Sequence, residues 1–195
     1  MRISAPVRIL ATALILAAPL AQAQTIDSRT AKKMLFGTSS DVTLGQADLI
    51  DSNVAKAIKQ AGKQIPYYGA IAVSPGEPTS SNLMPTIGNL HSAESAQKAA
   101  LDNCNARRTV GGPCVVIATI TPKRYKAQPL TLSVGATKYF GKEYRKMDEP
   151  KAIAISPSTG AFGADRGDGG RALSKCAAAA KAKGGSDCRL VIADQ

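Results

Sequence analysis

The hexapeptide AIAISP at residues 152–157 occurs once more upstream, as AIAVSP at residues 70–75. Each copy precedes an alanine-rich stretch that carries one cysteine, Cys176 in the second case and Cys104 in the first. A Gly-Gly pair follows each stretch, and then a second cysteine opens a run of aliphatic residues. Because these features recur in the same order, the sequence predicts an internal duplication.

Each hexapeptide predicts a strand, because a short apolar run ends at a proline. A turn, a returning strand, a helix and a final strand are expected after it. In the second unit these segments are residues 151–156, 157–160, 161–164, the alanine-rich helix and 188–193. In the first unit they are the strand 67–73, a longer Pro/Ser-rich excursion, a return strand within 84–90, the helix 93–106 capped by Ser92 or His91, and the strand 114–120.

An amphipathic helix is expected before each unit, at residues 46–63 and 133–147, because apolar side chains recur there at helical spacing. The sequence therefore predicts an α+β protein. It would consist of two tandem disulfide-stapled helix–β-hairpin–helix–strand repeats packed as one body. The expected order is a signal peptide (1–23), an N-terminal helix and loop (24–45), repeat one (46–120), a basic connector (121–132) and repeat two (133–195).

The N-terminus has the three parts of a secretory signal peptide. Arg2 and Arg8 are positive, residues 9–20 form an apolar run, and residues 21–23 (AQA) are a small-x-small cleavage site. The run is shorter than the roughly 20 apolar residues of a membrane span. Cleavage after Ala23 would release a soluble chain into the periplasm or the medium, beginning with a short helix at 26–35 and a loop at 38–45.

Export would place the four cysteines in an oxidising compartment, where disulfides are expected. Four cysteines allow three connectivities. The duplication favours Cys104 with Cys114 and Cys176 with Cys188, because each pair joins a helix to the strand after it. Each such bond contributes about 3 kcal/mol to stability. A zinc site is not expected, because the chain has no C-x-x-C pair and its single histidine lies far from the cysteines in the sequence.

Net charge is +11, and removal of the first 23 residues leaves 23 basic against 14 acidic residues. Between the two units this charge lies close to aromatic residues, a combination that binds anionic polymers by stacking and charge neutralisation. The candidate anion-binding residues are Lys123, Arg124, Lys126, Lys138, Lys142, Arg145 and Lys146. The alternative places the aromatic side chains in the core and the lysines in solvent. No specific nucleic acid is expected as a partner.

No combination of nucleophile and base is evident, so no catalytic residue is assigned. A hydrolase would need His91, which lacks a G-x-S-x-G element and is expected at the surface or as a helix cap, so that His91→Ala should leave folding nearly intact.

The polar turn at residues 165–170 could hold a cation through Asp165 and Asp168. It lacks the spacing of a calcium loop, and the simpler expectation is an exposed turn with Asp168 as helix N-cap. No metal or cofactor is expected. The sequence does not support assignment as an aminolevulinate synthase, because that enzyme is a much larger pyridoxal-phosphate protein, whereas this chain has 195 residues and is expected to be exported.

The second unit resembles a known family. The hexapeptide, the return strand GAFG at 160–163, a helical cysteine and a strand cysteine are similar to the secreted bacterial family called domain of unknown function 4189. The first unit has the same order without the glycine–aromatic return strand. The resemblance covers the two units and not the N-terminal helices. It implies a small, disulfide-bonded, exported α+β domain, and it transfers no catalytic residue.

The leading hypothesis is an exported, non-enzymatic binding or inhibitor-like protein, whose partner is a periplasmic protein or an anionic envelope polymer. A small periplasmic hydrolase that uses His91 or the turn of Asp165 and Asp168 is the second hypothesis. A basic structural protein of the envelope is the third. A single stoichiometric protein partner would favour the first hypothesis, and a salt-labile mixture of polyanions the third.

Overall fold

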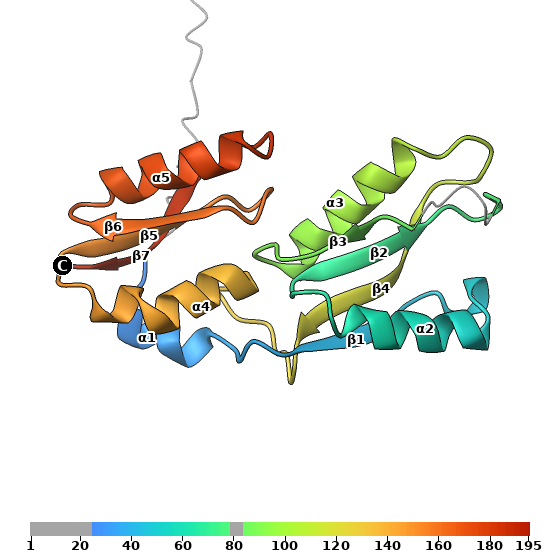
Figure 1. The fold of residues 1–195 in the computed structure, drawn as a ribbon, viewed down its shortest axis with the longest axis horizontal. Coiled ribbons are helices and arrows are strands. Elements are labelled where there is room, and N and C mark those ends of the chain that lie inside the picture. Colours follow the sequence, from blue (N-terminus) through green and yellow to red (C-terminus); the bar gives the residue numbers. More distant parts are fainter. Residues whose placement is uncertain (1–24, 79–83) are drawn as a thin grey trace, which may run out of the picture.

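The structure is a computed structural model that describes residues 25–78 and 84–195. The fold is α+β with two antiparallel sheets (Figure 1). The expected signal peptide lies outside the described residues. The elements are α1 (Ser28–Met34), β1 (Ser40–Leu44), α2 (Ser52–Gly62), β2 (Gly69–Val73), β3 (Thr86–Ile87), α3 (Ala93–Asn105), β4 (Val115–Pro122), α4 (Val134–Lys142), β5 (Lys151–Ile155), β6 (Phe162–Arg166), α5 (Gly170–Lys181) and β7 (Arg189–Asp194).

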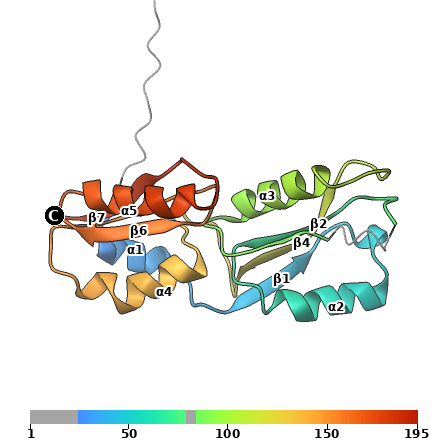
Figure 2. The same cartoon turned by 45° about the horizontal axis from the view of Figure 1, so that its top comes forward.

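The first sheet has four strands in the order β1-β4-β2-β3, and the second has three in the order β6-β5-β7. We call the first sheet with α2 and α3 the first half, and the second sheet with α1, α4 and α5 the second half. Helices α3 and α5 cover one face of their sheets, whereas α2 in the first half and α1 with α4 in the second cover the other. Figure 2 shows the same three layers in each half after a turn of the molecule.

The two sheets are built around corresponding strands. Strand β2 pairs antiparallel with β3 and β4, and β5 pairs in the same way with β6 and β7. The register shifts at the same point of each hexapeptide, between Ile71 and Ala72 and between Ile153 and Ala154. The expected order of hairpin, helix and strand is therefore present in both halves.

The N-terminal segment joins the two halves. Ile26 lies at the edge of β7, where its N–H donates to the carbonyl oxygen of Val191 at 3.1 Å, and the chain then crosses to the first half and forms β1 along β4. The expectation of a loop at residues 38–45 is wrong. Val42 and Leu44 alternate toward the first core, and β4 supplies the backbone hydrogen bonds that this short segment cannot make within itself.

Other expected elements are present with different bounds. The helix expected at 46–63 begins after Asp51, whose carboxylate accepts N–H groups of the first turn, and a 3-10 turn precedes it. The helix expected at 133–147 divides into α4 and the 3-10 turn Tyr144–Lys146. Strand β4 continues to Pro122, into the expected connector.

Small side chains bring α3 and α5 onto their sheets. Ala96 and Ala100 of α3 and Ala172 and Ala180 of α5 are fully buried. Gly163 of β6 shows how close this approach is, because a Cβ added there would lie 2.3 Å from the carbonyl oxygen of Ala172. Since alanine buries little apolar area, each helix depends on close contact and on its disulfide rather than on large side chains.

Candidate functional site

Both disulfides form as the sequence predicts. Cys104 at the end of α3 bonds to Cys114 before β4, and Cys176 of α5 bonds to Cys188 before β7, with Cα–Cα distances of 6.0 and 6.1 Å. The described part of the chain has no free cysteine. It also has no helix long and apolar enough to cross a membrane. Two disulfides are compatible with an extracellular or periplasmic protein.

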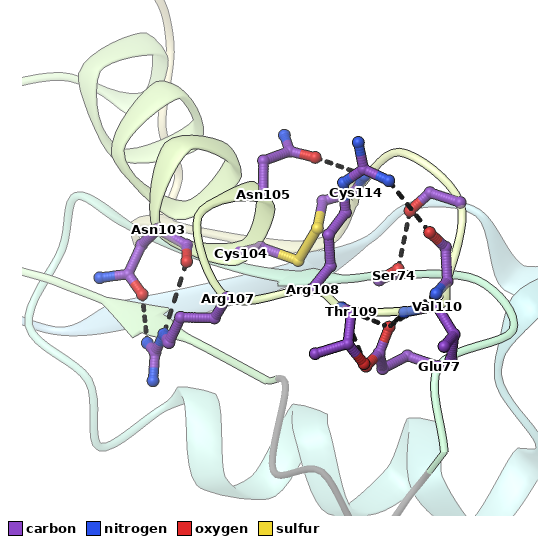
Figure 3. Close-up of a disulfide and its surroundings, with 12 residues drawn as sticks. Ser74, Glu77, Asn103, Cys104, Asn105, Arg107, Arg108, Thr109, Val110 and Cys114 are labelled. Atoms are coloured by element: carbon purple, nitrogen blue, oxygen red, sulfur yellow. Dashed lines mark hydrogen bonds between the residues drawn. A yellow bond between two sulfur atoms is a disulfide. The ribbon is translucent and has the colours of Figure 1, made fainter.

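The first disulfide closes a loop, residues 104–114, whose backbone is extensively bonded (Figure 3). Every backbone N–H from residue 107 to residue 112 has a hydrogen-bond partner. The acceptors are the carbonyl oxygen of Cys104 for residues 107 and 108, the carboxylate of Glu77 for residues 109, 110 and 111, and the carbonyl oxygen of Pro75 for residue 112. We call residues 104–114 the closed loop.

The carboxylate of Glu77 organises the closed loop from the neighbouring turn. It accepts the hydroxyl of Thr109 at 2.6 Å, the N–H of Gly111 at 2.7 Å and the N–H of Val110 at 3.2 Å. These hydrogen bonds, that of the Thr109 hydroxyl first, lower the pKa of Glu77 below its ordinary value. Three successive N–H groups directed at one anion form a nest, and here the anion is part of the same chain.

The base of the closed loop is held by a close approach to the turn after β2. Ser74 donates its hydroxyl to the carbonyl oxygen of Gly112 at 2.7 Å. A Cβ at Gly111 would lie 2.1 Å from the Ser74 Oγ atom, so only glycine fits this position. The Gly-Gly pair seen in the sequence is therefore required by packing at its first residue.

An apolar side chain lies at the tip of the closed loop. Val110 is 75% exposed, the largest exposure among the large apolar residues that the structure describes as exposed. The exposed Arg107 and Arg108 precede it, and both guanidinium groups are oriented by the chain itself. Arg107 donates to the carbonyl oxygen and the side chain of Asn103, and Arg108 donates to the carbonyl oxygen of Gly111 at 3.0 Å.

In the second half a carboxylate also joins the disulfide loop to the turn after the hexapeptide strand. Here the carboxylate belongs to the disulfide loop and the donors belong to the turn. Asp187, in the loop before β7, accepts the hydroxyl of Ser156 and both the N–H and the hydroxyl of Ser158, the last two at 2.8 and 2.9 Å. Burial acts to raise the pKa of Asp187, but these hydrogen bonds hold it below its ordinary value. Four residues before the strand cysteine, the second half has Gly184 where the first half has Val110, so that position offers no apolar side chain.

His91 is only 2% exposed and lies between the halves, so the expectation of a surface or capping histidine is wrong. Ser92 caps α3 instead. The N–H of Ser133 donates to Nδ1 of His91 at 3.0 Å, and Nε2 lies 2.9 Å from the carbonyl oxygen of Ala161. Burial lowers the pKa of His91 to about 4. Both ring nitrogens are thus bonded to the backbone, and the ring is not positioned to deprotonate a serine.

The two carboxylates of the polar turn do not converge on a common point. Asp165 pairs with Lys175 at 2.9 Å, and this hydrogen bond lowers the pKa of Asp165. Asp168 accepts the N–H of Gly170 at 3.0 Å, while Gly169 is the N-cap of α5 in place of the expected Asp168. Within the described ranges, no group of three or more His, Cys, Asp or Glu residues is placed to hold a metal ion.

The candidate anion-binding residues are all exposed and lie on two separate elements. Lys123, Arg124 and Lys126 follow β4 in the first half, whereas Lys138, Lys142, Arg145 and Lys146 lie on α4 and the turn after it. The aromatic residues between them are in the core: Phe140 and Tyr144 are buried, and Tyr125 contacts Tyr68 and Phe36. The arrangement is the alternative considered above, with buried aromatic side chains and solvated lysines.

Sequence patterns gave no sign of Glu77 or Val110, because their relationship depends on a contact across about thirty residues of chain. The available signals were a Gly-Gly pair inside a short disulfide loop and an isolated valine beside two arginines. Comparison with protein-family models, with curated proteins and with solved structures finds no match to this chain.

Proposed function

We propose that the protein is an exported, non-enzymatic binding protein that contacts a protein partner through the closed loop. The observation that carries this proposal is the bonding of Glu77 to the backbone of Thr109, Val110 and Gly111, which fixes the chain beneath an exposed valine. A loop that is ordered before binding loses little conformational entropy on association, so more of the contact energy contributes to affinity.

The chemistry of the tip indicates the kind of surface that fits it. Val110 requires a small apolar pocket, and Arg107 and Arg108 favour carboxylates at the rim of that pocket. Arginine is enriched among the residues that dominate binding energies, especially beside a well-packed anchor. The excess of basic over acidic residues after residue 23, 23 against 14, also favours an acidic partner over a second copy of this chain.

We further infer that the two halves are tandem copies of one unit, packed as one body. The matching register shifts and the matching disulfides support this inference. Export by a signal peptide at residues 1–23 and membership of the family called domain of unknown function 4189 are also proposals, and they are supported by the sequence features described above.

The proposal is tested by capture from a cell-envelope extract with the mature protein fixed to beads. We expect one stoichiometric protein partner, which is lost with Val110→Asp because a carboxylate would enter the apolar pocket uncompensated. The matched control is Val54→Asp, since Val54 of α2 is also an exposed valine, at 38%, but lies outside the closed loop.

A partner that is retained equally by the Val110→Asp and Val54→Asp variants would contradict the proposal. A mixture of anionic polymers that elutes with moderate salt would instead favour a basic structural protein of the envelope. Hydrolytic activity that disappears in a folded His91→Gln variant would favour the hydrolase hypothesis.

A further inference from the structure

A cleft of about 400 Å³ opens between the two halves, and none of the residues that line it belongs to the closed loop. The first half contributes Ser92 and Ser95 at the start of α3, and the second half contributes the ends of β5 and β7. The connector between β4 and α4 and the N-terminal Ile26 complete the wall. Clefts between the parts of a fold are a common location for small-molecule sites.

Part of the lining of the cleft is apolar. Ile26, Leu130 and Val191 line it, and all three also belong to, or pack against, the second hydrophobic core. Packing against the second core therefore fixes the positions of these three side chains. No aromatic or acidic residue lines the cleft within the described chain, which disfavours a nucleobase or a metal cation as its ligand.

The lining of the cleft carries one charge, that of Arg189. Its side chain is exposed, and within the described residues its guanidinium group has no ion pair or hydrogen bond. At the corresponding position of the first half, counted from the strand cysteine, the residue is Val115. The nearby carboxylate of Asp187 is engaged by Ser156 and Ser158, so it is not free to pair with Arg189.

The lining of the cleft also includes a hydroxyl donor. Ser92 donates its hydroxyl to the Oγ atom of Ser95 at 3.2 Å, which leaves the Ser95 proton able to donate into the cleft. An unpaired cation and a hydroxyl donor thus face the same space as an ordered aliphatic wall. A ligand complementary to this lining has a negatively charged head and an aliphatic chain.

We propose that this cleft binds a small amphiphilic anion, with its charged head on Arg189 and Ser95 and its aliphatic chain against Ile26, Leu130 and Val191. The head is a carboxylate or a phosphate monoester, both of which accept hydrogen bonds from a guanidinium group. This site is separate from the closed loop, and its ligand does not depend on the proposed protein partner.

Calorimetric titration with decanoate tests the proposal. Decanol has the same chain without the charge, and acetate has the charge without the chain, so both should bind more weakly than decanoate. Arg189→Gln should weaken decanoate binding by about tenfold or more, which corresponds to about 1.4 kcal/mol, and should leave decanol binding unchanged. Decyl phosphate in place of decanoate distinguishes the two kinds of head group.

The matched control is Arg29→Gln, which removes an exposed arginine of α1 that does not line the cleft and is not a candidate anion-binding residue. Ser95→Leu should also reduce decanoate binding, because its side chain would occupy the cleft. The proposal would be overturned if the wild-type chain does not bind decanoate or binds decanoate and decanol equally. It would also be overturned if Arg29→Gln weakens decanoate binding as much as Arg189→Gln does. Val110→Asp should bind decanoate normally, so failure of the closed-loop proposal would be seen separately.

Discussion

The imidazole of His91 donates its Nε2 proton to the carbonyl oxygen of Ala161, 2.9 Å away in the other half of the molecule. The tautomer follows from Ser133, whose N–H donates to Nδ1 at 3.0 Å and requires that nitrogen to be unprotonated. Asn89 adds a second link, because its side-chain oxygen accepts the N–H of Gly135 at 3.1 Å. The neutral form of His91 therefore joins the halves, and the charged form cannot accept from Ser133.

This contact predicts that the protein loses stability in mild acid. Burial, with the charges of Lys183 and Arg189, lowers the folded-state pKa of His91 to about 4, against the opposing influence of the Ala161 carbonyl and of Asp187. In the unfolded chain His91 has its ordinary pKa of 6.5. Its contribution to the free energy of unfolding is therefore fully present above pH 6.5 and is lost as the pH falls toward 4. The loss should reach about 3 kcal/mol in urea unfolding followed from pH 7 to pH 4.

The matched control is His91→Gln, which should remove this part of the pH dependence. Unchanged wild-type stability between pH 7 and pH 5 would contradict the assignment. The sequence alone predicts that His91→Ala is tolerated. From the structure we expect this change to lower the free energy of unfolding by about 1–3 kcal/mol, because the buried N–H of Ser133 would lose its acceptor.

The features predicted well from sequence are those that depend on local pattern. The hexapeptides predict β2 and β5, the alanine-rich stretches predict α3 and α5, and the order of cysteines predicts both disulfides. In each case the required information lies within a few residues of the element, as apolar periodicity or as the spacing between helix and strand.

The features that were missed depend on contacts between distant residues. Strand β1 forms because β4 offers it an edge, and His91 is buried because Ser133 and Ala161 surround it from the other half. Glu77 lies in a Pro/Ser-rich excursion. Nothing in the sequence around it indicates that its carboxylate accepts hydrogen bonds from Val110 and the neighbouring residues. Local patterns carry no information on such pairings, so the candidate site could not be predicted.

Removal of the first disulfide should loosen the closed loop as well as destabilise the fold. The variant Cys104→Ser with Cys114→Ser opens a loop with a sequence separation of 10 residues, and its free energy of unfolding should fall by about 3 kcal/mol. Non-reducing peptide mapping should first show Cys104 with Cys114 and Cys176 with Cys188 in the exported protein. Crossed pairs or free thiols would contradict the structure.

Glu77→Gln should release the backbone of the closed loop without changing the side chains at its tip. An amide oxygen is a weaker acceptor than a carboxylate, so the N–H groups of residues 109–111 should exchange with deuterium roughly tenfold faster or more. The control is Asp187→Asn, which alters the corresponding contact of the second half. If the two variants change the exchange rates of residues 109–111 equally, Glu77 does not specifically hold the closed loop.

Gly163→Ala should destabilise the second half, because the added Cβ would lie 2.3 Å from both the carbonyl oxygen of Ala172 and the nitrogen of Cys176. We expect a loss of about 1–3 kcal/mol in urea unfolding, as is usual for overpacking. Gly141→Ala in α4 is the matched control. Its Cβ would have no neighbour within 4 Å, so the change should be neutral or slightly stabilising. Equal stability of the two variants would contradict the close contact between α5 and β6.

The exposed basic residues of α4 and the turn after it allow a separate test of polyanion binding. Lys142, Arg145 and Lys146 have no ion pair within the described residues, and each phosphate that they neutralise would release counterions. If this surface binds an anionic polymer, changing the three residues to Gln together should lower the slope of log affinity against log salt by about one for each lost contact.

The triple variant should change the free energy of unfolding by no more than about 0.5 kcal/mol, because exposed lysines contribute little to folding. An unfolded triple variant would show instead that these side chains are structural. Binding that is independent of salt, or absent near physiological ionic strength, would remove polyanions as partners. The closed loop and the cleft would then remain as the two proposed binding surfaces.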